Sequence, residues 1–468
     1  MIHQMGMDQF GLLSVVWAII GYVVVLEFGL GRVATKVMAE GRLKKEFSRE
    51  ITSSIIILTF LNIIGGSLLF YFSDPLVKTF FEIPKELQPT AINSIQTIGV
   101  FSFAINFSAF FRGVLEGVNQ FAKVNFIHVL IGSSNFIIPV VVWSYSPNIE
   151  SVVFWLMVAR SIGAIAFGAV ALKELSLTIS WDTGAFKRVF HFGGWMTVSH
   201  VIANMLLQID KLILGATGPV QRVSFFSAPF EMIYRVNIIP GALLRAVFPV
   251  FADGSEAHGI RVRKIYLFYL KFINFLLYPI LLGLAYFSSE LLTLWIGSDF
   301  ASQSTIVMQW VSLGVLLNSG HYLPFGHLQG SEKANFSGKI HLVLLPIQIL
   351  ATYFFILEFG LLGAALAWVF RSFCETTMIF YFSTKTLFEN GHPFLKIYIF
   401  QTIWSFLSWG ILVFLTQLES RFIVYLVVVV AFVFLHLKFI YSKEEKERIA
   451  DLLKLIQGKI FGTNKPTI

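Results

Sequence analysis

The sequence is poor in cysteine and in charged residues. Its 468 residues include one cysteine, Cys374, and only 13% are Asp, Glu, Lys or Arg. A single cysteine excludes a disulfide framework or a cysteine metal cluster within one chain. Soluble globular domains carry roughly 25% charged residues. This composition therefore leaves too few polar side chains to cover a water-exposed surface.

Apolar residues make up most of the remainder. The chain is 56% hydrophobic and 16% aromatic, with 50 Phe and 35 Gly residues. Because Phe supplies lipid-facing bulk and Gly allows close helix contacts, this composition predicts a membrane protein. We attribute the formal net charge of +8 to cytoplasmic loops that face anionic lipid, and nucleic-acid binding is the poorer interpretation.

Hydrophobic segments of membrane-spanning length recur along the whole chain. At roughly 20 mainly apolar residues per helix, the sequence predicts an all-α polytopic membrane protein with about 13 transmembrane helices. The expected spans are 11–30, 51–72, 89–112, 124–145, 149–172, 191–213, 223–249, 264–287, 302–326, 336–357, 359–383, 397–417 and 421–441. The segments between them are short, so no inserted soluble domain is expected.

Lys and Arg residues concentrate in alternate loops. One set of loops holds most of them, including 32–49, 112–123, 173–188, 245–264 and the tail, whereas the other holds only Lys78, Lys85, Arg222 and Arg421. Because cationic loops are retained in the cytoplasm, the first span is expected to run inward and residues 1–10 to lie outside.

An internal repeat relates the two halves of the chain. GLGRVATKVMAEG at 29–41 aligns with ALLRAVFPVFADG at 242–254, and GVLEG at 113–117 aligns with GHLQG at 326–330, at one offset (326 − 113 = 213). The copies lie six spans apart, which predicts a parallel repeat about an axis near the membrane normal. The span at 191–213 would map just before Met1, so we expect the first helix of a fourteen-helix pattern to be missing.

The stretch GLGRVA at 29–34 also matches the G-x-G-x-x-G/A pattern of a dinucleotide-binding turn. Its repeat partner begins Ala242-Leu243-Leu244 and lacks both glycines, which disfavours a duplicated phosphate loop. Both copies keep an arginine, Arg32 and Arg245, at the cytoplasmic mouth. We expect these arginines to anchor the topology, with capture of a lipid diphosphate as the alternative.

Four longer motifs resemble one transporter family. They are FGLLSVVWAIIGYVVVLEFGLGRVATKVMAEG, FRGVLEGVNQFAKVN, QIDKLILGATG and LLTLWIGSDF. Their order and spacing resemble the oligosaccharide and polysaccharide flippases, of the O-antigen type, in the multidrug/oligosaccharidyl-lipid/polysaccharide exporter superfamily. The resemblance covers nearly the whole chain from the family's second helix onward.

The resemblance implies both an architecture and an activity. It implies two six-helix lobes packed as a V, with two further helices; the domain boundaries expected here are 1–185, 186–385, 386–441 and a cytoplasmic amphipathic tail at 442–468. The implied function is movement of an undecaprenyl-diphosphate-linked oligosaccharide from the inner to the outer leaflet of a bacterial inner membrane. The family is thought to exchange this cargo against protons or sodium. No cofactor and no metal site are expected.

Ionisable residues inside the spans are the candidate site residues, because a charge at the membrane centre costs about 3 kcal/mol on insertion scales. Arg160, Arg235 and Arg371 lie near the middle of their spans, and we predict that they contact the diphosphate. Carboxylates four residues away, Glu231 and Glu375, offer ion pairs to Arg235 and Arg371 as the alternative role. Arg160 has no such neighbour.

The span at 191–213 carries a polar stripe. His200, Asn204, Gln208 and Lys211 recur at helical spacing, and such a stripe cannot face lipid because its polar groups would lack partners. We predict that it lines the cargo cleft, with helix packing as the alternative. Asp210, Glu231 and Glu375 are the candidate carboxylates for ion coupling, and the sequence does not choose among them.

Two other functions stay open. A drug exporter of the same superfamily would favour an acidic or aromatic cleft for organic cations. A membrane glycan polymerase or ligase would need clustered acids or histidines in a large external loop, which the sequence lacks.

At the C-terminal end, Ser442 and Glu445 have capping-box spacing and predict a surface helix. Binding of polymerase or assembly proteins by this helix is an open alternative.

Overall fold

A computed structural model describes residues 5–40, 46–175, 201–252, 258–330, 333–387, 395–413, 418–442 and 445. Helices and turns account for all regular structure in these ranges. The main helices of the first half are α2 (Met7–Val23), α3 (Leu30–Glu40), α4 (Glu46–Tyr71), α6 (Gln88–Val100), α7 (Ser102–Gly117), α8 (Phe121–Tyr145) and α9 (Ile149–Ala171). We call this group the N-terminal lobe.

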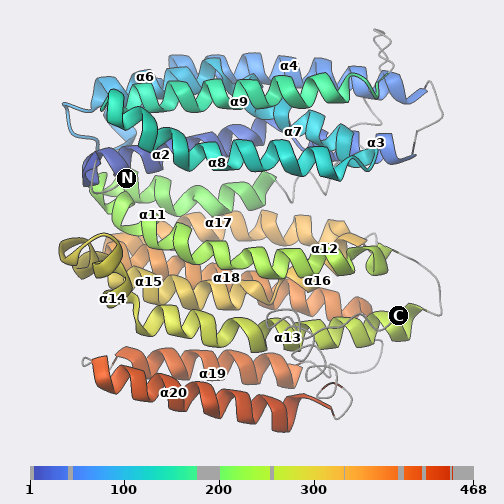
Figure 1. Ribbon diagram of the computed structural model, residues 1–468, viewed down its shortest axis with the longest axis vertical. Coiled ribbons are helices and arrows are strands. Elements are labelled where there is room, and N and C mark those ends of the chain that lie inside the picture. Colours follow the sequence, from blue (N-terminus) through green and yellow to red (C-terminus); the bar gives the residue numbers. More distant parts are fainter. Residues whose placement is uncertain are drawn as a thin grey trace, which may run out of the picture.

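The second half begins with a helix at 201–217. It continues with α11 (Gln221–Tyr234), α12 (Ile238–Ala252), α13 (His258–Tyr286), α14 (Ser288–Trp295), α15 (Ser298–Ser319), α16 (Tyr322–Gly330), α17 (Ala334–Phe359) and α18 (Leu361–Leu387). We call this group the C-terminal lobe. Two further helices, α19 (Leu395–Val413) and α20 (Leu418–Leu435), lie along one edge of it (Figure 1).

Within the described residues, eight helices are long and apolar enough to cross a membrane, or nine if the bent pair α6 and α7 counts as one span. The predicted all-α polytopic fold is therefore confirmed, whereas the number 13 is not. Several expected spans are divided: a 3₁₀ turn at Arg235–Asn237 separates α11 from α12, and a 41° bend separates α6 from α7. The expected spans at 191–213 and 397–417 lie partly outside the described residues.

Local sequence signals explain several helix ends. The Asn148 side chain accepts a hydrogen bond from the Glu150 N–H at 3.0 Å and caps α9, as expected for an N-cap asparagine. Gly297 (φ 124°) precedes α15 and Gly360 (φ 57°) ends α17. Positive φ is accessible to glycine without steric cost, so both turns depend on the missing Cβ.

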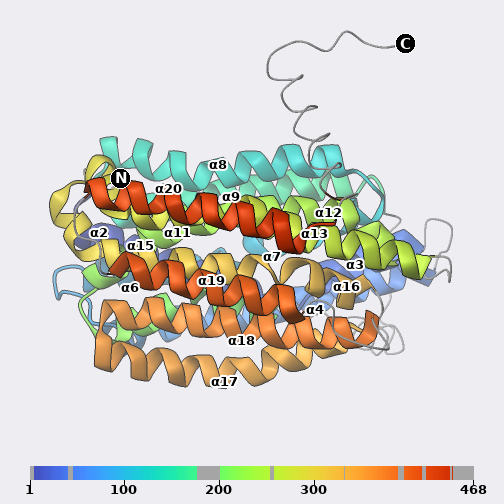
Figure 2. The ribbon, with the colours of Figure 1, turned by 90° about the horizontal axis from the view of Figure 1, so that it is seen from below.

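The two lobes repeat each other helix by helix at the offset seen in the sequence. α8 starts at Phe121 and α17 at Ala334 (334 − 121 = 213), and α9, α4 and α2 correspond in the same way to α18, α13 and α11. In Figure 2 the equivalent helices α8 and α17 lie along opposite edges of the molecule. The 201–217 helix has no counterpart among the described residues, because the same offset would place it before residue 5.

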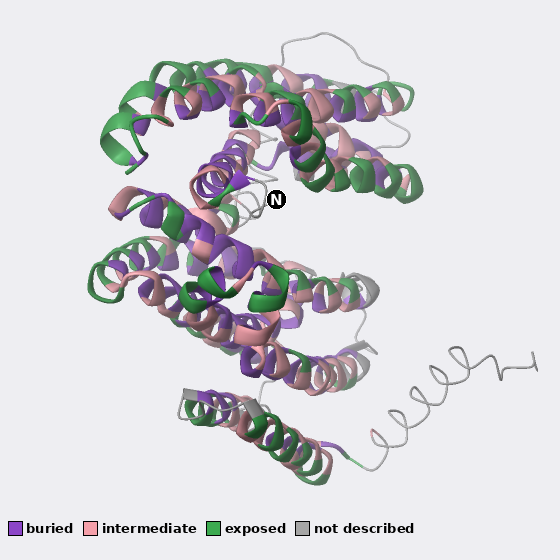
Figure 3. Ribbon diagram, turned by 60° about the vertical axis from the view of Figure 1, so that its left-hand side comes forward, coloured by how far each residue is buried: buried purple, intermediate pink, exposed green. Residues whose placement is uncertain are grey.

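Large apolar side chains cover the outside of the bundle. Leu294 is 89% exposed and Tyr145 87% exposed, and exposed residues line the outward faces of the helices in Figure 3, while buried ones face neighbouring helices. This pattern suits hydrocarbon as the surrounding medium. Inside, α2 packs against α11 and joins the lobes, and α13 packs against both α19 and α20.

Candidate functional site

A central cavity of about 320 Å³ lies where the two lobes meet. Its wall is formed by α2 and the 3₁₀ turn that follows it at Val24–Glu27, by α8, α9 and α11, and by the 201–217 helix. The lining residues are Trp17, Ile20, Gly21, Val24, Asn135, Phe136, Arg160, Gln208, Lys211 and Glu231. Four residues predicted from the sequence, Arg160, Gln208, Lys211 and Glu231, thus come together around one space.

Arg160 reaches this cavity from α9. Its Nη2 donates a hydrogen bond to the Asn135 side-chain oxygen on α8 at 2.9 Å. Its Nε is buried and has no hydrogen-bond partner within the described ranges. A buried donor without an acceptor costs about 1–3 kcal/mol, so an anion that entered the cavity would gain a contact that the protein itself leaves open.

Lys211 and Glu231 form the second charged group of the cavity. The Lys211 Nζ lies 2.7 Å from Glu231 Oε1, and the side chains are 2% and 40% exposed respectively. The ammonium group also lies 5.3 Å from the centroid of the Phe230 ring. The lysine is therefore held by its partners, while the carboxylate remains accessible from the cavity.

Arg235 lies next to the cavity and does not line it. It begins the 3₁₀ turn after α11, and its guanidinium lies 4.4 Å above the Phe136 ring, in cation–π contact. Glu231 pairs with Lys211, and no ion pair joins it to Arg235 among the described residues. The other expected pair, Arg371 with Glu375, does form.

A second polar cluster lies inside the C-terminal lobe. Asp210 is 1% exposed, and its Oδ1 accepts hydrogen bonds from Gln348 at 3.1 Å and Thr352 at 3.0 Å, both on α17. Two oxygens of this cluster, Asp210 Oδ2 and Gln348 Oε1, are buried and have no hydrogen-bond partner in the described part of the chain.

Arg371 and Glu375 extend the polar interior of the same lobe. Glu375 lies 3.1 Å from Arg371 Nη1 and 3.1 Å from His341 Nε2. The Arg371 guanidinium also stacks 4.0 Å from the Trp368 ring centroid. The structure therefore separates the predicted site residues: Arg371, Asp210 and Glu375 lie in the C-terminal lobe, apart from the cavity that Arg160 and Lys211 line.

A smaller cavity of about 120 Å³ continues the polar stripe toward the α3 end of the N-terminal lobe. Asn204 lines it together with Glu27, Thr35, Arg112 and Glu116, among others. Val24 lines both this cavity and the central one. Asn204 thus lines the smaller cavity, and Gln208 and Lys211 line the central one; the predicted role of the stripe in the cargo cleft stays a prediction.

Residues 4–255 match the family described as polysaccharide biosynthesis protein. The chain belongs to this polysaccharide biosynthesis family. The match covers more than half of the 468 residues and includes every helix that lines the central cavity, so the resemblance seen in the four sequence motifs is confirmed.

Two relatives illustrate the family. A putative O-antigen transporter of Shigella flexneri is 27% identical over 390 residues, which is 82% of this chain and 93% of the relative. The lipopolysaccharide biosynthesis protein WzxC of Escherichia coli strain K12 is 22% identical over 395 residues, 82% of this chain and 76% of the relative.

Solved structures share the fold of this family member. An inward-facing multidrug resistance transporter of the MATE family, in the MOP superfamily, superposes with a TM-score of 0.70 at 16% identity, covering 82% of this chain and 91% of that one. The lipid II flippase MurJ, in an inward closed conformation, gives 0.64 at 14% identity, covering 92% and 97%. At these identities the likeness shows the fold alone.

The glycine-rich stretch of this family member is a helix crossing. Gly29 (φ 67°) follows Phe28 (φ 47°), and the Gly31 N–H donates to Glu27 Oε1 at 2.7 Å. A Cβ added to Gly113 would lie 2.1 Å from the Gly31 carbonyl oxygen. The glycines thus let the backbones of α3 and α7 come into contact. The aligned segment of the second repeat, residues 242–244, needs no glycine because the equivalent helix contact there is made by a side chain.

One predicted residue and two predicted side chains lie outside the described structure. His200 falls in 176–200, which the structure does not describe, and the side chains of Arg32 and Arg245 are not described either.

Sequence reasoning missed Asn135, Gln348, Thr352 and His341. The last three recur at spacings of seven and four along α17, so the same stripe argument applied to that span would have found them. Within the described residues, no group of three or more His, Cys, Asp or Glu could hold a metal ion.

Proposed function

We propose that this protein is a flippase that moves an undecaprenyl-diphosphate-linked oligosaccharide from the inner to the outer leaflet of a bacterial inner membrane by alternating access. The observation that carries the proposal is the central cavity between the lobes, where Arg160 and Lys211 face one space with amide groups of Asn135 and Gln208. Relatives named as an O-antigen transporter and a lipopolysaccharide biosynthesis protein support it.

In the proposed cycle, Arg160 and Lys211 bind the diphosphate. The unpartnered Arg160 Nε is a free donor for a phosphate oxygen, and a guanidinium binds phosphate through paired donors. Lys211 is paired with Glu231, so the diphosphate competes with this carboxylate for the ammonium group. The amides of Gln208 and Asn204 then serve sugar hydroxyls, while the lipid chain stays in the bilayer.

Closure on the external side is the second part of the proposal. With the topology expected from the basic loops, three inter-lobe contacts lie near the outer ends of α2 and α11. Ser224 Oγ donates to the Met7 carbonyl at 2.6 Å, the Glu82 N–H donates to the Gly215 carbonyl at 2.8 Å, and Gly11 abuts Val220. These contacts must break before cargo can leave outward.

Asp210 is our candidate for ion coupling. Its Oδ2 and the nearby Gln348 Oε1 are buried oxygens without donors in the described ranges, and oxygens of this kind suit a proton or a sodium ion. Glu375 is already held by Arg371 and His341, and Glu231 by Lys211. We therefore assign the coupling role to Asp210 first, with protons and sodium both open.

Export of organic cations is the second candidate function, favoured by one observation. Glu231 is 40% exposed in a cavity that also presents the aromatic rings of Trp17 and Phe136, and aromatic rings with a carboxylate suit a cation. This function predicts that Glu231→Gln abolishes efflux while Arg160→Gln does not. The flippase predicts the reverse order of severity.

The domain boundaries 1–185, 186–385, 386–441 and 442–468 fit this proposal. The first two hold the two lobes that alternate, and the third holds α19 and α20. Lipid-linked oligosaccharide and membrane lipids are the proposed partners, and a polysaccharide polymerase or assembly protein is the candidate partner for the tail. Arg32 and Arg245 are proposed to anchor the cytoplasmic mouth, and His200 belongs to the proposed polar stripe.

Reconstitution tests the proposal directly. The full chain is placed in liposomes with a fluorescent undecaprenyl-diphosphate oligosaccharide, and translocation is followed by quenching of the probe that remains outside. Arg160→Gln and Lys211→Gln should abolish most transport, because a phosphate contact is lost in each. Lys173→Gln, an exposed residue beyond the end of α9, is the matched control and should flip normally. Unchanged flipping by both cavity variants would overturn the cationic site.

A further inference from the structure

The smaller cavity at the α3 end of the N-terminal lobe adjoins the proposed diphosphate site. Val24 lines both spaces, and Asn204 of the smaller cavity lies four residues before Gln208 of the central one on the same helix. Four residues of an α-helix rise about 6 Å. A group covalently attached to a diphosphate that Arg160 and Lys211 hold is therefore within reach of the smaller cavity.

Small residues at the crossing of α3 and α7 form one wall of this cavity. Gly29, Gly31, Ala109 and Gly113 line it, and a Cβ on Gly113 would lie 2.1 Å from the Gly31 carbonyl oxygen. The Thr35 hydroxyl lies within hydrogen-bond distance of the carbonyl oxygens of Gly31 and Gly113, at 2.9 and 3.0 Å. Backbone and short side chains thus leave room for a ligand beside the longer polar side chains.

Four longer polar side chains also line the cavity: Glu27, Arg112, Glu116 and Asn204. The Arg112 Nε lies 3.6 Å from Glu116 Oε1, and the two side chains are 39% and 29% exposed. This separation is beyond hydrogen-bond distance, so both groups keep hydrogen-bonding capacity for a ligand. The Asn204 side chain is exposed and lines the same space. The cavity therefore offers donors and acceptors together.

This mixture of donors and acceptors suits a sugar better than an ion. A hydroxyl both donates and accepts hydrogen bonds, so a sugar can donate to the Glu116 carboxylate and accept from Arg112 and Asn204. An anion would meet the carboxylates of Glu27 and Glu116, and a cation would meet the Arg112 guanidinium, at close range. Hydrogen bonds that involve a charged group are also roughly twice as strong as neutral ones.

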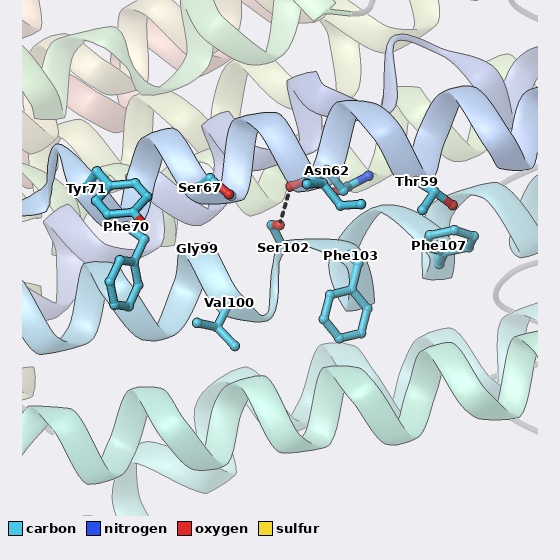
Figure 4. A pocket seen from close by; sticks show the side chains of 12 residues that line it. Thr59, Asn62, Ser67, Phe70, Tyr71, Gly99, Val100, Ser102, Phe103 and Phe107 are labelled. Carbon is cyan, nitrogen blue, oxygen red and sulfur yellow. Dashed lines mark hydrogen bonds between the residues drawn. The ribbon is translucent and has the colours of Figure 1, made fainter.

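The charged lining distinguishes the smaller cavity from a cavity of about 610 Å³ between α4 and the bent pair α6 and α7 (Figure 4). None of the twelve residues that line this larger cavity is charged, and Phe70, Tyr71, Val100, Phe103 and Phe107 are among them. Tyr71, Val100 and Phe103 are each more than half exposed, at 78%, 54% and 51%. The larger cavity offers a sugar hydroxyl no charged partner, so we assign it no part of the polar headgroup.

We propose that the smaller cavity is a saccharide subsite, which binds the sugar bonded directly to the diphosphate of the cargo. The inference rests on the proposed flippase function. Glu116 and Arg112 bind neighbouring hydroxyls as acceptor and donor, and Asn204 binds a third polar group of the sugar. With the topology expected from the basic loops, the α3 end faces the cytoplasm, so this sugar is bound on the side where cargo is loaded.

Paired lipids test the saccharide subsite. The full chain in lipid nanodiscs is titrated with undecaprenyl diphosphate alone and with undecaprenyl diphosphate that carries one glucose, galactose, N-acetylglucosamine or N-acetylgalactosamine. Binding is measured as displacement of a fluorescent undecaprenyl diphosphate. At least one sugar should improve the affinity about tenfold, as one hydrogen bond to a charged group can. Equal affinity for the sugarless lipid and for every sugar-bearing lipid would overturn the subsite.

Variants of the lining residues locate the effect. Glu116→Gln keeps the shape of the side chain without its charge, and Asn204→Leu removes an amide; each should lose most of the affinity gained from the sugar. Glu86→Gln removes an exposed carboxylate of the same lobe outside both cavities and, as the matched control, should keep the gain. Binding of the sugarless lipid shows that each variant is folded. A full gain in both Glu116→Gln and Asn204→Leu would contradict the site.

A photoreactive sugar gives a second readout. Undecaprenyl diphosphate that carries an N-acylhexosamine with a diazirine in its acyl group is irradiated with the full chain, and the labelled peptides are identified by mass spectrometry. Labelling should fall on 27–35 and 109–116, and an excess of the preferred sugar-bearing lipid should remove it. Labelling confined to segments outside the lining of the smaller cavity would overturn the proposal.

The same lipids separate this proposal from the flippase. Arg160→Gln should weaken binding of the sugarless and the sugar-bearing lipids by the same factor, because the diphosphate is common to both, so the gain from the sugar persists. If the wild type flips the fluorescent cargo but shows no gain from any sugar, the subsite fails and the flippase stands. If the wild type shows the gain yet flips no cargo, the flippase fails and the subsite stands.

Discussion

Gly31 and Gly113 face each other at the crossing of α3 and α7, and the residues 213 positions further on, Leu244 and Gly326, face each other at the crossing of α12 and α16. A Cβ on Gly113 would lie 2.1 Å from the Gly31 carbonyl oxygen, and one on Gly326 would lie 2.1 Å from Leu244 Cδ1. An equivalent helix–helix contact therefore occurs within each lobe. In the N-terminal lobe it involves a backbone carbonyl, and in the C-terminal lobe it involves a leucine side chain.

This difference predicts unequal costs for two matched substitutions. Gly113→Ala should destabilise the protein by about 1–3 kcal/mol, the usual penalty of overpacking, because the carbonyl of Gly31 cannot move aside without shifting α3. Gly326→Ala should cost less, since Leu244 can change rotamer. The measurement is the thermal midpoint of the detergent-solubilised protein followed by size-exclusion fluorescence.

Two controls accompany this comparison. Gly132→Ala should be neutral, because an added Cβ there meets nothing within 4 Å. Adding Leu244→Ala to Gly326→Ala should remove the destabilisation that Gly326→Ala causes, because the added methyl group then no longer meets the Leu244 side chain. Equal destabilisation by Gly113→Ala and Gly326→Ala would contradict the assignment of a backbone contact to one lobe and a side-chain contact to the other.

Much of the fold follows from the sequence because the membrane restricts the choices. Hydrocarbon admits only helices with internal hydrogen bonds, so apolar length predicts spans, and the 213-residue offset predicts which helices correspond. The predicted number of spans is not confirmed, and the sequence gives no polar signal where the chain breaks, as at Arg235–Asn237 and at the bend near Phe101. Those breaks depend on tertiary packing.

The site was predictable only along single helices. Helical spacing identified Asn204, Gln208 and Lys211 as one stripe, and that face does line both cavities. The partner that each charge takes depends on a neighbouring helix, so the sequence could not tell that Lys211 pairs with Glu231 or that Gln348 reaches Asp210. The roles assigned to these residues remain predictions.

Asp210→Asn should uncouple transport. The amide keeps the shape of the side chain and can still accept hydrogen bonds from Gln348 and Thr352, but it cannot hold a proton or a sodium ion by charge. In liposomes, the variant should lose the acceleration that an imposed proton or sodium gradient gives to the wild type. Varying each gradient separately identifies the ion.

The matched control for this variant is Asp299→Asn, an exposed carboxylate at the start of α15, which should keep the response to the gradient. Gln348→Leu, which removes one of the two unpartnered oxygens, should weaken the response without removing the carboxylate. An Asp210→Asn variant that still follows the gradient would transfer the coupling role to Glu231 or Glu375.

Gly11→Ala should loosen the external closure. A Cβ there would lie 2.3 Å from the Val220 carbonyl oxygen and 2.9 Å from Ser224 Oγ, so α2 and α11 must separate. In a Ser224→Cys, Cys374→Ser background, the added methyl group should raise labelling of Cys at position 224 by a membrane-impermeant maleimide supplied from outside. Gly410→Ala, where a Cβ meets nothing within 4 Å, should not change labelling.

The start of the C-terminal tail should detach at low pH. Burial alone would raise the pKa of the Glu445 carboxyl, but hydrogen bonds from the Ser442 N–H and from Lys271 outweigh it and lower that pKa. The Ser442 hydroxyl in turn accepts from the Glu445 N–H at 3.3 Å, so the predicted capping box is present. The carboxylate lies 2.9 Å from the Lys271 ammonium, and both side chains are largely buried, at 15% and 10% exposed.

Because the folded pKa of Glu445 is below its unfolded value, the contact contributes its full stability above the unfolded pKa and loses it as pH falls through the folded one. Its loss costs about 1.5–3 kcal/mol, the usual net value of a hydrogen bond to a charged group. Limited proteolysis of the tail should therefore accelerate as pH falls below about 4, near the ordinary pKa of a glutamate.

Glu445→Gln should show the faster cleavage already at neutral pH and little further change on acidification. Glu419→Gln removes an exposed carboxylate at the start of α20 and should behave as the wild type. Tail cleavage in Glu445→Gln that still accelerates on acidification would assign the pH response to another group.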